Sequence, residues 1–163
     1  HRHPSAEPPE HYHDLQAALA RHAPLQNEYR GPAYLLPPFS DVPPQLVLLS
    51  AQHAQLVEDS FPWLVAWLAS PTNGPVAAVV EQGRAVSVCF CSRLTARAAE
   101  AGLETLPSHR GRGYAPQAVM GWAAAIQRSR RLALYSTSWQ NHASQRVAKK
   151  VGAQLYAEDW SLA

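Results

Sequence analysis

One short loop carries the residue types that bind phosphate. It reads Leu-Pro-Ser-His-Arg-Gly-Arg-Gly-Tyr-Ala over residues 106–115. Gly111 and Gly113 let the backbone come close to an anion, because they have no Cβ atom. Arg110 and Arg112 add cationic donors, and a guanidinium group can hold a phosphate through two parallel hydrogen bonds. The loop therefore predicts either an anion site or, alternatively, a tight turn with solvated arginines.

The segments on either side of the loop favour the anion site. Residues 99–106 read as an extended strand, and residues 116–130 have the apolar periodicity of a helix. The first N–H groups of a helix have no partner within the helix, and the helix dipole is positive at that end. A strand that leads through glycines into a helix is thus typical of phosphate binding. The Walker loop and the dinucleotide fingerprint do not fit, because no Gly-Lys-Ser/Thr follows and Pro116 replaces the third glycine.

A second motif follows further along the chain. Residues 141–152 read Asn-His-Ala-Ser-Gln-Arg-Val-Ala-Lys-Lys-Val-Gly, after a strand-like run over residues 132–138. Asn141 is a favourable helix N-cap, and Gly152 is a favourable helix stop. The order of loop, helix, strand and Asn-x-x-Ser-x-x-Val-Ala-x-Lys-x-Gly resembles the GNAT N-acetyltransferase superfamily. The resemblance extends from about Val76 to the C-terminus and, less closely, from Gln45.

The resemblance implies acetyl-coenzyme A (acetyl-CoA) as the co-substrate. GNAT enzymes hold it on an Arg/Gln-x-x-Gly-x-Gly/Ala loop, and Arg110, Gly113 and Ala115 match that pattern. In the family the pantetheine arm lies between two splayed strands, and Asn141 would contact it as well as capping a helix. The cofactor-binding residues implied are Leu103, Glu104, Thr105, Arg110, Gly111, Arg112, Gly113, Tyr114, Ala115, Asn141 and Ser144. Lys149 and Lys150 could reach the 3′-phosphate, or they could form a solvated helix face.

Two carboxylates are candidates for the catalytic base. Transfer of an acetyl group from a thioester to an amine requires that the amine lose a proton. In GNAT enzymes a carboxylate on the fourth strand often takes it, sometimes through water. Glu100 and Glu104 lie four residues apart on that predicted strand, and on one face if the strand is regular. We predict that one of them is the base, with Glu100 nearer the usual family position, although either could instead be solvated or salt-bridged.

The leaving-group acid is where the sequence departs from the family. Many relatives have a tyrosine seven residues after the motif asparagine, a position held here by Ala148. Tyr135, Ser136 or Ser144 could replace it, or the thiolate could leave unaided, since the pKa of an ordinary thiol is ~8.5. Fold does not settle function. The alternative to an N-acetyltransferase is therefore a non-catalytic module that binds or senses acyl-CoA.

The remaining patterns predict the elements that position these residues. Strands are expected over residues 45–49, 75–81, 85–92 and 153–162, and helices over residues 50–59 and 61–69. Trp63 and Trp67 share one face of the second helix, where they could pack in the core or wall the acceptor site. The predicted fold is α/β, with a mixed, mostly antiparallel central sheet whose fourth and fifth strands splay apart, flanked by helices.

Composition separates the first 44 residues from the rest. Residues 1–44 form a Pro/His-rich, partly irregular extension that could include a helix over 12–22 and a strand or arm over 29–36, and residues 45–163 form the GNAT-like domain. The histidines at 1, 3, 11 and 13 are spaced too loosely to predict a metal site, and the spacing of Cys89 and Cys91 suits neither a disulfide framework nor a zinc knuckle.

Charge and hydropathy limit the partners. The formal net charge of +2 does not argue for nucleic acid or a membrane surface, and no apolar run approaches the ~18 residues of a membrane span. We expect a cytoplasmic monomer or homodimer that uses no metal. Its acceptor is predicted to be a small-molecule or peptide amine.

Overall fold

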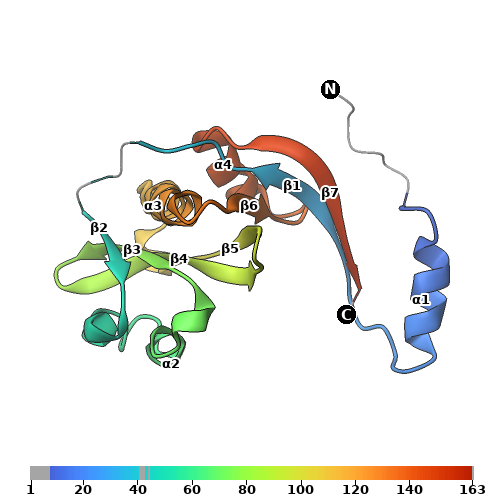
Figure 1. Cartoon of the computed structure of the whole chain (residues 1–163), viewed down its shortest axis with the longest axis horizontal. Coiled ribbons are helices and arrows are strands. Elements are labelled where there is room, and N and C mark those ends of the chain that lie inside the picture. The colour runs from blue at the N-terminus through green and yellow to red at the C-terminus, as the bar shows by residue number, and fades with distance from the viewer. Residues whose placement is uncertain (1–7, 41–42, 44, 163) are drawn as a thin grey trace.

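One twisted sheet runs through the molecule (Figure 1). The computed structural model describes residues 8–40, 43 and 45–162. The sheet has seven strands in the order β2-β3-β4-β5-β6-β1-β7. In chain order the strands are β1 (Glu28–Leu35), β2 (Leu46–Leu49), β3 (Val76–Glu81), β4 (Arg84–Leu94), β5 (Ala98–Thr105), β6 (Leu132–Ser136) and β7 (Gln154–Leu162). The β5–β6 pair is parallel and the other described pairs are antiparallel, as the sequence predicts for a mixed α/β sheet.

Helices cover both faces of the sheet, and an apolar cluster lies on each face. The helices are α1 (Tyr12–Ala20), α2 (Trp63–Leu68), α3 (Tyr114–Arg128) and α4 (His142–Lys150), with short 3-10 turns η1 (Ala51–Leu56), η2 (Pro71–Asn73) and η3 (Pro107–His109). Helix α3 buries Trp122 and Ile126 in the larger cluster, which also contains Tyr135 of β6 and Ala148 of α4. Leu64 of α2 belongs to the smaller cluster on the other side. None of the described helices is long and apolar enough to span a bilayer.

Strands β5 and β6 separate after a short paired segment. They pair only where Ala98–Glu100 faces Leu132–Leu134. Beyond Glu100, the rest of β5 stays paired with β4, and β6 pairs with β1 instead. The sequence prediction counts its strands from residue 45 and does not include β1. Its fourth strand is therefore β5, and its fifth strand is β6. The predicted splay is therefore confirmed, and it leaves free backbone groups along residues 101–105.

Strand β1 lies inside the sheet, although the sequence places it in the N-terminal extension. It pairs with β6 over Ala33–Leu35 and with β7 along its whole length. At Gly31 the backbones come so close that an added Cβ would lie 1.8 Å from the Thr137 carbonyl oxygen. The N–H of Thr137 donates a 3.2 Å hydrogen bond to the Pro32 carbonyl just beyond the end of β6. Residues 28–35 therefore share one sheet with the strands that follow residue 45.

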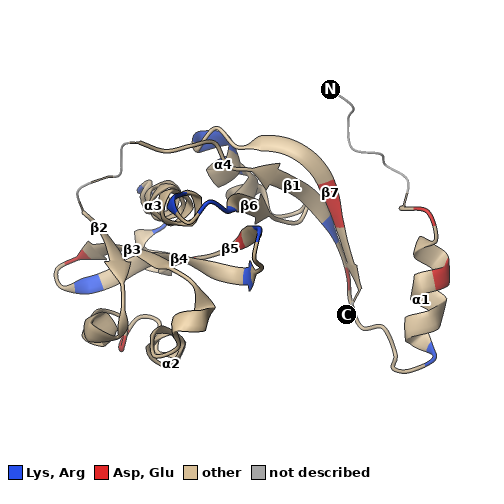
Figure 2. Cartoon of the chain, in the orientation of Figure 1, with Lys and Arg blue, Asp and Glu red and all other residues tan. Residues whose placement is uncertain are grey.

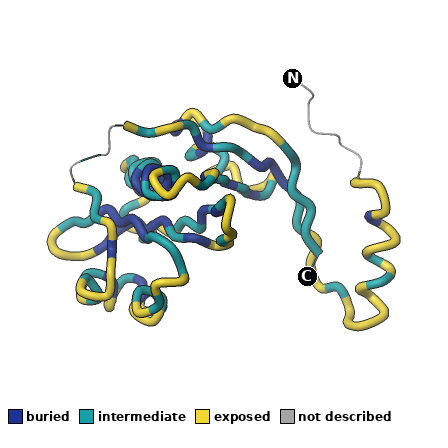
Figure 3. Tube along the Cα trace, viewed as in Figure 1, coloured by how far each residue is buried: buried dark blue, intermediate teal, exposed yellow. Residues whose placement is uncertain are grey.

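Several elements differ in detail from the predicted ones. The predicted helix over residues 50–59 is a 3-10 turn over Ala51–Leu56, which Ser50 and His53 close by reciprocal capping hydrogen bonds. Helix α3 begins at Tyr114 rather than at Pro116, because Gly113 provides the N-cap. Helix α1 lies beside the end of the β1–β7 ribbon and away from the other helices (Figure 1), and its outer residues are exposed (Figure 3). Its buried Tyr12 ring packs against Trp160 of β7 at 4.9 Å between centroids.

Candidate active site

A cleft of about 1040 Å³ opens where β5 and β6 separate. Its walls are the second half of β5, the loop after it, the end of β6 and the first turns of α4. The cleft has the volume of a small-molecule site. All the residues predicted to bind the cofactor line it, apart from Arg112.

The backbone explains the two glycines of the loop. Gly111 has φ 77° and Gly113 has φ 86°, in the left-handed region that L side chains rarely adopt. A Cβ added to either residue would have no neighbour within 4 Å, so their conformation, not crowding, requires glycine. Gly113 is the N-cap of α3, so the unpaired N–H groups of the first turn begin at the cleft. Backbone donors and the positive end of the dipole can thus bind a phosphate there.

The two arginines of the loop have different surroundings. Arg110 lines the cleft, and its Nε donates to the Thr105 carbonyl at 3.3 Å. Arg112 lies outside the cleft with its Nη1 4.0 Å from Oε2 of Glu81, on β3. The same carboxylate accepts a hydrogen bond from the Tyr114 hydroxyl and lies 3.3 Å from His109 Nε2. Glu81 therefore fixes the loop to the sheet, and Arg112 belongs to that contact.

Helix α4 begins at the cleft. The Oδ1 of Asn141 accepts a 3.0 Å hydrogen bond from the N–H of Ser144, which makes Asn141 the predicted N-cap. Arg146 and Lys150 line the cleft from the same helix, and both are exposed. Lys149 is exposed on α4 but does not line the cleft. Lys150 is thus the lysine that could reach a phosphate of the cofactor.

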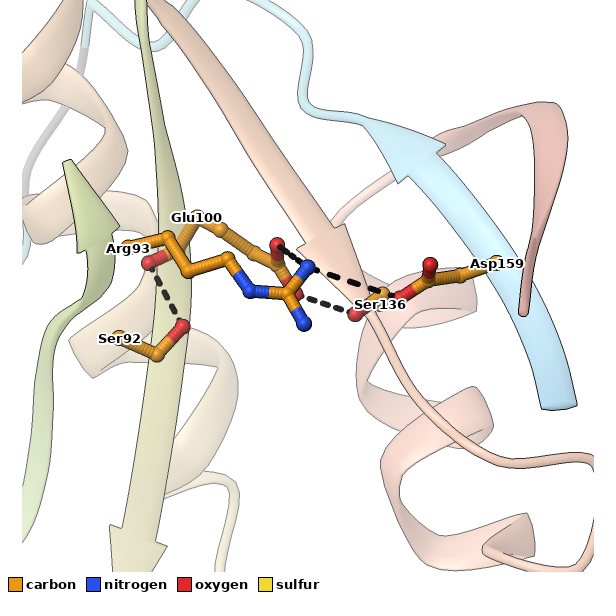
Figure 4. A network of polar contacts seen from close by, with 5 residues as sticks. All are labelled: Ser92, Arg93, Glu100, Ser136 and Asp159. Atoms are coloured by element: carbon orange, nitrogen blue, oxygen red, sulfur yellow. Dashed lines mark hydrogen bonds and ion pairs between the residues drawn. The ribbon is translucent and has the colours of Figure 1, made fainter. Parts of the chain in front are cut away.

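The two glutamates of β5 occupy different environments. Glu104 is exposed and lines the cleft. Glu100 accepts a 3.1 Å hydrogen bond from Nη1 of Arg93 and another from the hydroxyl of Ser136, and its side chain is 18% exposed (Figure 4). Arg93 also lies 3.8 Å from Asp159 of β7. Glu100 itself does not line the cleft but is joined to it through Ser136, which does.

Tyr29 is a cleft residue that sequence reasoning missed. It comes from β1 and lines the cleft near Ser136. Burial raises the pKa of its hydroxyl, and a hydrogen bond with Ser136 partly offsets that effect. The neighbouring charges of Asp159, Glu100 and Arg93 also act on it. No local motif marks Tyr29, because only the pairing of β1 with distant strands brings it to the site.

A second pair of hydroxyls lies on the helix side of the cleft. The Tyr135 and Ser144 hydroxyl oxygens are 2.6 Å apart, and both residues line the cleft. Tyr135 is only 2% exposed, and Ala148 is fully buried in the same apolar cluster. Burial raises the pKa of Tyr135 to about 12, although the hydrogen bond with Ser144 lowers it in part. Tyr135 therefore keeps its proton near neutral pH.

The tryptophans of α2 pack on the sheet and do not line the cleft. Trp63 and Trp67 meet each other edge to face at 5.8 Å between centroids, and their rings lie 4.7 and 5.7 Å from that of Phe90. Phe90 in turn covers Gly102, where an added Cβ would lie 2.4 Å from its ring. This arrangement supports the core-packing alternative for both tryptophans.

The described residues contain no group of three or more His, Cys, Asp and Glu side chains that could hold a metal ion. His1 and His3 lie outside the described residues. Cys89 and Cys91 are buried free thiols. Burial raises the pKa of both, and for Cys89 the shift is large, so neither thiol ionises readily.

Comparison with known proteins identifies the family. A family model described as an acetyltransferase (GNAT) domain matches residues 11–154. A protein of Novosphingobium aromaticivorans described as a GNAT-family acetyltransferase superposes with a TM-score of 0.64 at 19% identity, over 85% of this chain and 65% of that one. A Drosophila protein superposes with a TM-score of 0.66 at 17% identity, over 93% of this chain and 56% of that one. No curated protein matches the sequence.

One further solved structure contains the expected ligand. An aminoglycoside N-acetyltransferase, AAC(6')-Iy, in complex with CoA superposes with a TM-score of 0.52 at 18% identity, over 66% of this chain and 89% of its own. The chain spans 65% and 56% of the length of the first two relatives, so they are substantially longer proteins. The family match nevertheless covers most of this sequence, and the splayed strands, glycine loop and Asn-capped helix agree with it. The chain therefore belongs to the GNAT acetyltransferase family.

Proposed function

We propose that the protein transfers an acetyl group from acetyl-CoA to a primary amine. The observation that carries this proposal is the cleft itself. The cleft lies in the gap between the splayed strands β5 and β6. It is lined both by the glycine loop at the start of α3, which is suited to bind phosphate, and by the carboxylate of Glu104 on β5. Family membership and a CoA-bound structural relative support the choice of co-substrate.

The loop and α4 would hold the nucleotide end of acetyl-CoA. The backbone N–H groups of residues 111–115 face the pyrophosphate in this proposal, and Arg110 adds charge. Arg146 and Lys150 provide further cations at the same cleft. The pantetheine arm would run along residues 103–105 of β5, where the strand has free backbone groups on the side of β6. Its amides can bond to that edge as a further strand would.

The acetyl group would then lie where β5 and β6 part. Near Ala101 and Tyr135 the two strands cease to pair, and both residues line the cleft there. An unpaired backbone N–H of β5 is suited to stabilise the oxyanion that forms on the thioester carbonyl. The incoming amine would lose its proton to Glu104, or to Glu100 through Ser136 and water. In this proposal one strand, β5, would supply both the base and the oxyanion donor.

The acceptor would be a cationic amine of a small molecule or a peptide. An amine is protonated near neutral pH, and Glu104 places an exposed carboxylate on the cleft wall. Glu100 and Asp159 add two further carboxylates on β5 and β7, and Arg93, which contacts both, offsets part of their charge. An amine is attracted to this end of the cleft before the base removes its proton.

The second candidate function is binding of acyl-CoA without turnover. Ala148 favours it, because this position has no hydroxyl to assist the departing thiolate. The two functions share the cofactor and differ in whether free thiol appears. An assay for thiol therefore separates them.

A screen of amines tests the proposal. The protein is incubated with acetyl-CoA and a panel of small amines and peptides with free N-termini, and free CoA is followed with a thiol reagent. We expect amine-dependent thiol release that is faster than in the absence of protein. Binding of acetyl-CoA, shown by a raised melting temperature, with no thiol release for any amine would favour the binding module. Absence of both would contradict the two candidates.

A further inference from the structure

The two faces of β5 give the cleft two different sides. Ala101 belongs to the larger apolar cluster, whereas Gly102 is covered by Phe90, which packs against the smaller one. Side chains alternate along a strand, so Glu104 projects to the same face as Gly102. Its cross-strand partner Val88 is buried in the smaller cluster, which agrees with that direction. Glu104 therefore lies on the face that α2 covers, and not on the face of α3 and α4.

The segment between η1 and α2 reaches the cleft on that same face. Ser60 and Phe61 both line the cleft. The Phe61 ring is only 3% exposed and belongs to the smaller cluster. The N–H groups of the two residues donate to the Val57 carbonyl, at 3.1 and 2.7 Å. Backbone hydrogen bonds and a buried ring thus hold Ser60 on the side of the cleft that also contains Glu104.

Ser60 has a buried hydroxyl without a partner. Its oxygen forms no hydrogen bond with any residue that the structure describes. The Tyr135 hydroxyl at the same cleft, by contrast, is bonded to that of Ser144. A buried polar group without a partner destabilises the folded chain, and such groups are uncommon in native structures. Because Ser60 lines the cleft, rotation about its Cα–Cβ bond can turn the hydroxyl toward a ligand that supplies the partner.

We propose that Ser60 recognises an oxygen atom of the acceptor, close to the reacting amine. This inference rests on the proposed acetyl transfer. The Glu104 carboxylate accepts hydrogen bonds from an ammonium group, and the Ser60 hydroxyl can donate one to a carbonyl or hydroxyl oxygen. An acceptor with nitrogen and oxygen on adjacent carbons presents both groups together. This class contains α-amino amides, among them the N-terminus of a peptide, and 1,2-amino alcohols.

The surroundings of Ser60 favour the acceptor over acetyl-CoA as its partner. Tyr114 of the glycine loop and Val147 of α4 pack against the larger cluster, so the groups proposed to hold the nucleotide lie on the other face. The pantetheine amides would pair with free backbone groups at residues 103–105. Ser60 remains for a ligand that approaches from the side of Glu104, as the proposed amine does.

Paired amines test the inference. Ethanolamine and propylamine differ only in that a methyl group replaces the hydroxyl, and glycinamide represents the α-amino amides. The kcat/KM of each amine is measured from thiol release with acetyl-CoA, for the unaltered chain, Ser60→Ala and Ser70→Ala. Ser70 is the matched control, because its hydroxyl is 2.8 Å from that of Thr72 and it does not line the cleft. Differences in amine basicity cancel, since the same amines are compared in every protein.

The ratio of kcat/KM for the oxygen-bearing amine to that for propylamine should fall in Ser60→Ala. A roughly three- to tenfold fall corresponds to the loss of one hydrogen bond. Ser70→Ala should keep the ratio of the unaltered chain. A fall with ethanolamine alone identifies amino alcohols as the acceptor class, and a fall with glycinamide alone identifies peptide-type amines. Ser60→Ala should also melt no lower than the unaltered chain, because it removes a hydroxyl that has no partner.

The remaining outcomes separate this inference from the proposed function. Equal ratios in Ser60→Ala and the unaltered chain would overturn the inference and leave acetyl transfer intact. Weakened binding of acetyl-CoA by Ser60→Ala, with equal ratios, would also overturn it and assign the hydroxyl to the cofactor. Absence of thiol release with every amine would contradict the proposed acetyl transfer, and this inference with it.

Discussion

Glu100 and Glu104 illustrate how one face of a strand can offer two different carboxylates. Both project to the same side of β5, as their spacing predicts. Glu104 is exposed at the cleft, whereas Glu100 is held by Arg93 and Ser136. A carboxylate that accepts two hydrogen bonds already has partners for its charge. Glu104 can therefore meet an incoming amine directly, and Glu100 can do so only through Ser136 or water.

We expect Glu104→Gln to lower kcat more than Glu100→Gln does. Loss of a general base typically reduces the rate ~10²–10⁴-fold. The kcat of each variant is measured across pH, with the best amine from the screen. The variant that removes the base should also lose the fall in rate on acidification. If both variants keep full activity and the same pH profile, neither carboxylate is the base, and solvent takes the proton.

Asn141 should have two separable roles. Asn141→Ala removes the acceptor for the Ser144 N–H and should lower the free energy of unfolding by ~1 kcal/mol. Asn141→Ser retains a capping oxygen but loses the amide that faces the cleft. Unfolding by denaturant and binding of acetyl-CoA are measured for both. A serine variant with restored stability but weakened binding supports the contact with the pantetheine arm, whereas restored binding leaves only the cap.

Strand β1 is the element that joins the N-terminal segment to the site. Arg30 of β1 forms an ion pair with Glu158 of β7, and its guanidinium lies 4.2 Å from the centroid of the Trp160 ring. Figure 2 shows basic and acidic segments side by side on these two strands. Glu158 also accepts a 2.6 Å hydrogen bond from Nε1 of Trp139, in the turn before α4. One carboxylate thus ties β1, β7 and the start of α4 together.

This carboxylate should make stability depend on acid pH. Burial tends to raise the pKa of Glu158, but the hydrogen bonds from Arg30 and Trp139 and the charge of Arg30 outweigh it, so its pKa falls below the ordinary 4.5. A lowered pKa in the folded state means that the unfolded chain binds the proton more tightly. The stabilisation is therefore complete above about pH 4.5 and is lost as the pH falls through the folded value.

Glu158→Gln checks this pH dependence. The variant should be less stable near neutral pH, because the ion pair with Arg30 is lost. Its melting temperature should also fall less steeply than that of the unaltered chain between about pH 5 and pH 3. Melting curves in that range provide the measurement. Parallel curves for the two proteins would show that Glu158 makes no contribution through its charge.

Local patterns in the sequence were sufficient for the core of the fold. The apolar periodicity located β3 to β7 and α3, and Asn141 and Gly152 marked the bounds of α4. The glycine loop was found because positive φ and close approach of an anion both require that residue type. These signals are short-range: each is contained within one element and its caps. The same is true of the cleft residues on the loop and β5, which follow from the family motif.

Contacts between distant segments could not be predicted in this way. Nothing in residues 28–35 indicates that they insert between β6 and β7, because strand pairing depends on which edges the rest of the fold leaves free. Tyr29 and its contact with Ser136 follow from that pairing. Arg110 and Arg112 look equivalent in the sequence. Arg112 lies outside the cleft beside Glu81, whose strand is distant in the sequence. The Tyr135–Ser144 bond likewise joins a strand to a separate helix.

Binding of acetyl-CoA by two matched glycine variants tests the central claim most directly. Gly113 and Gly83 both have positive φ, at 86° and 74°, and neither has an atom within 4 Å of an added Cβ. Gly113→Val and Gly83→Val should therefore suffer similar backbone strain, of about 1–2 kcal/mol. Gly113 lines the cleft, whereas Gly83 lies in the turn between β3 and β4.

Calorimetric titration with acetyl-CoA should separate the two variants. We predict that folded Gly113→Val loses affinity by about tenfold or more, because its side chain disturbs the charged hydrogen bonds that the loop would make to the pyrophosphate. Gly83→Val should bind as the unaltered chain does. Equal affinity of the two folded variants, or no binding by the unaltered chain, would contradict the assignment of this cleft to acetyl-CoA.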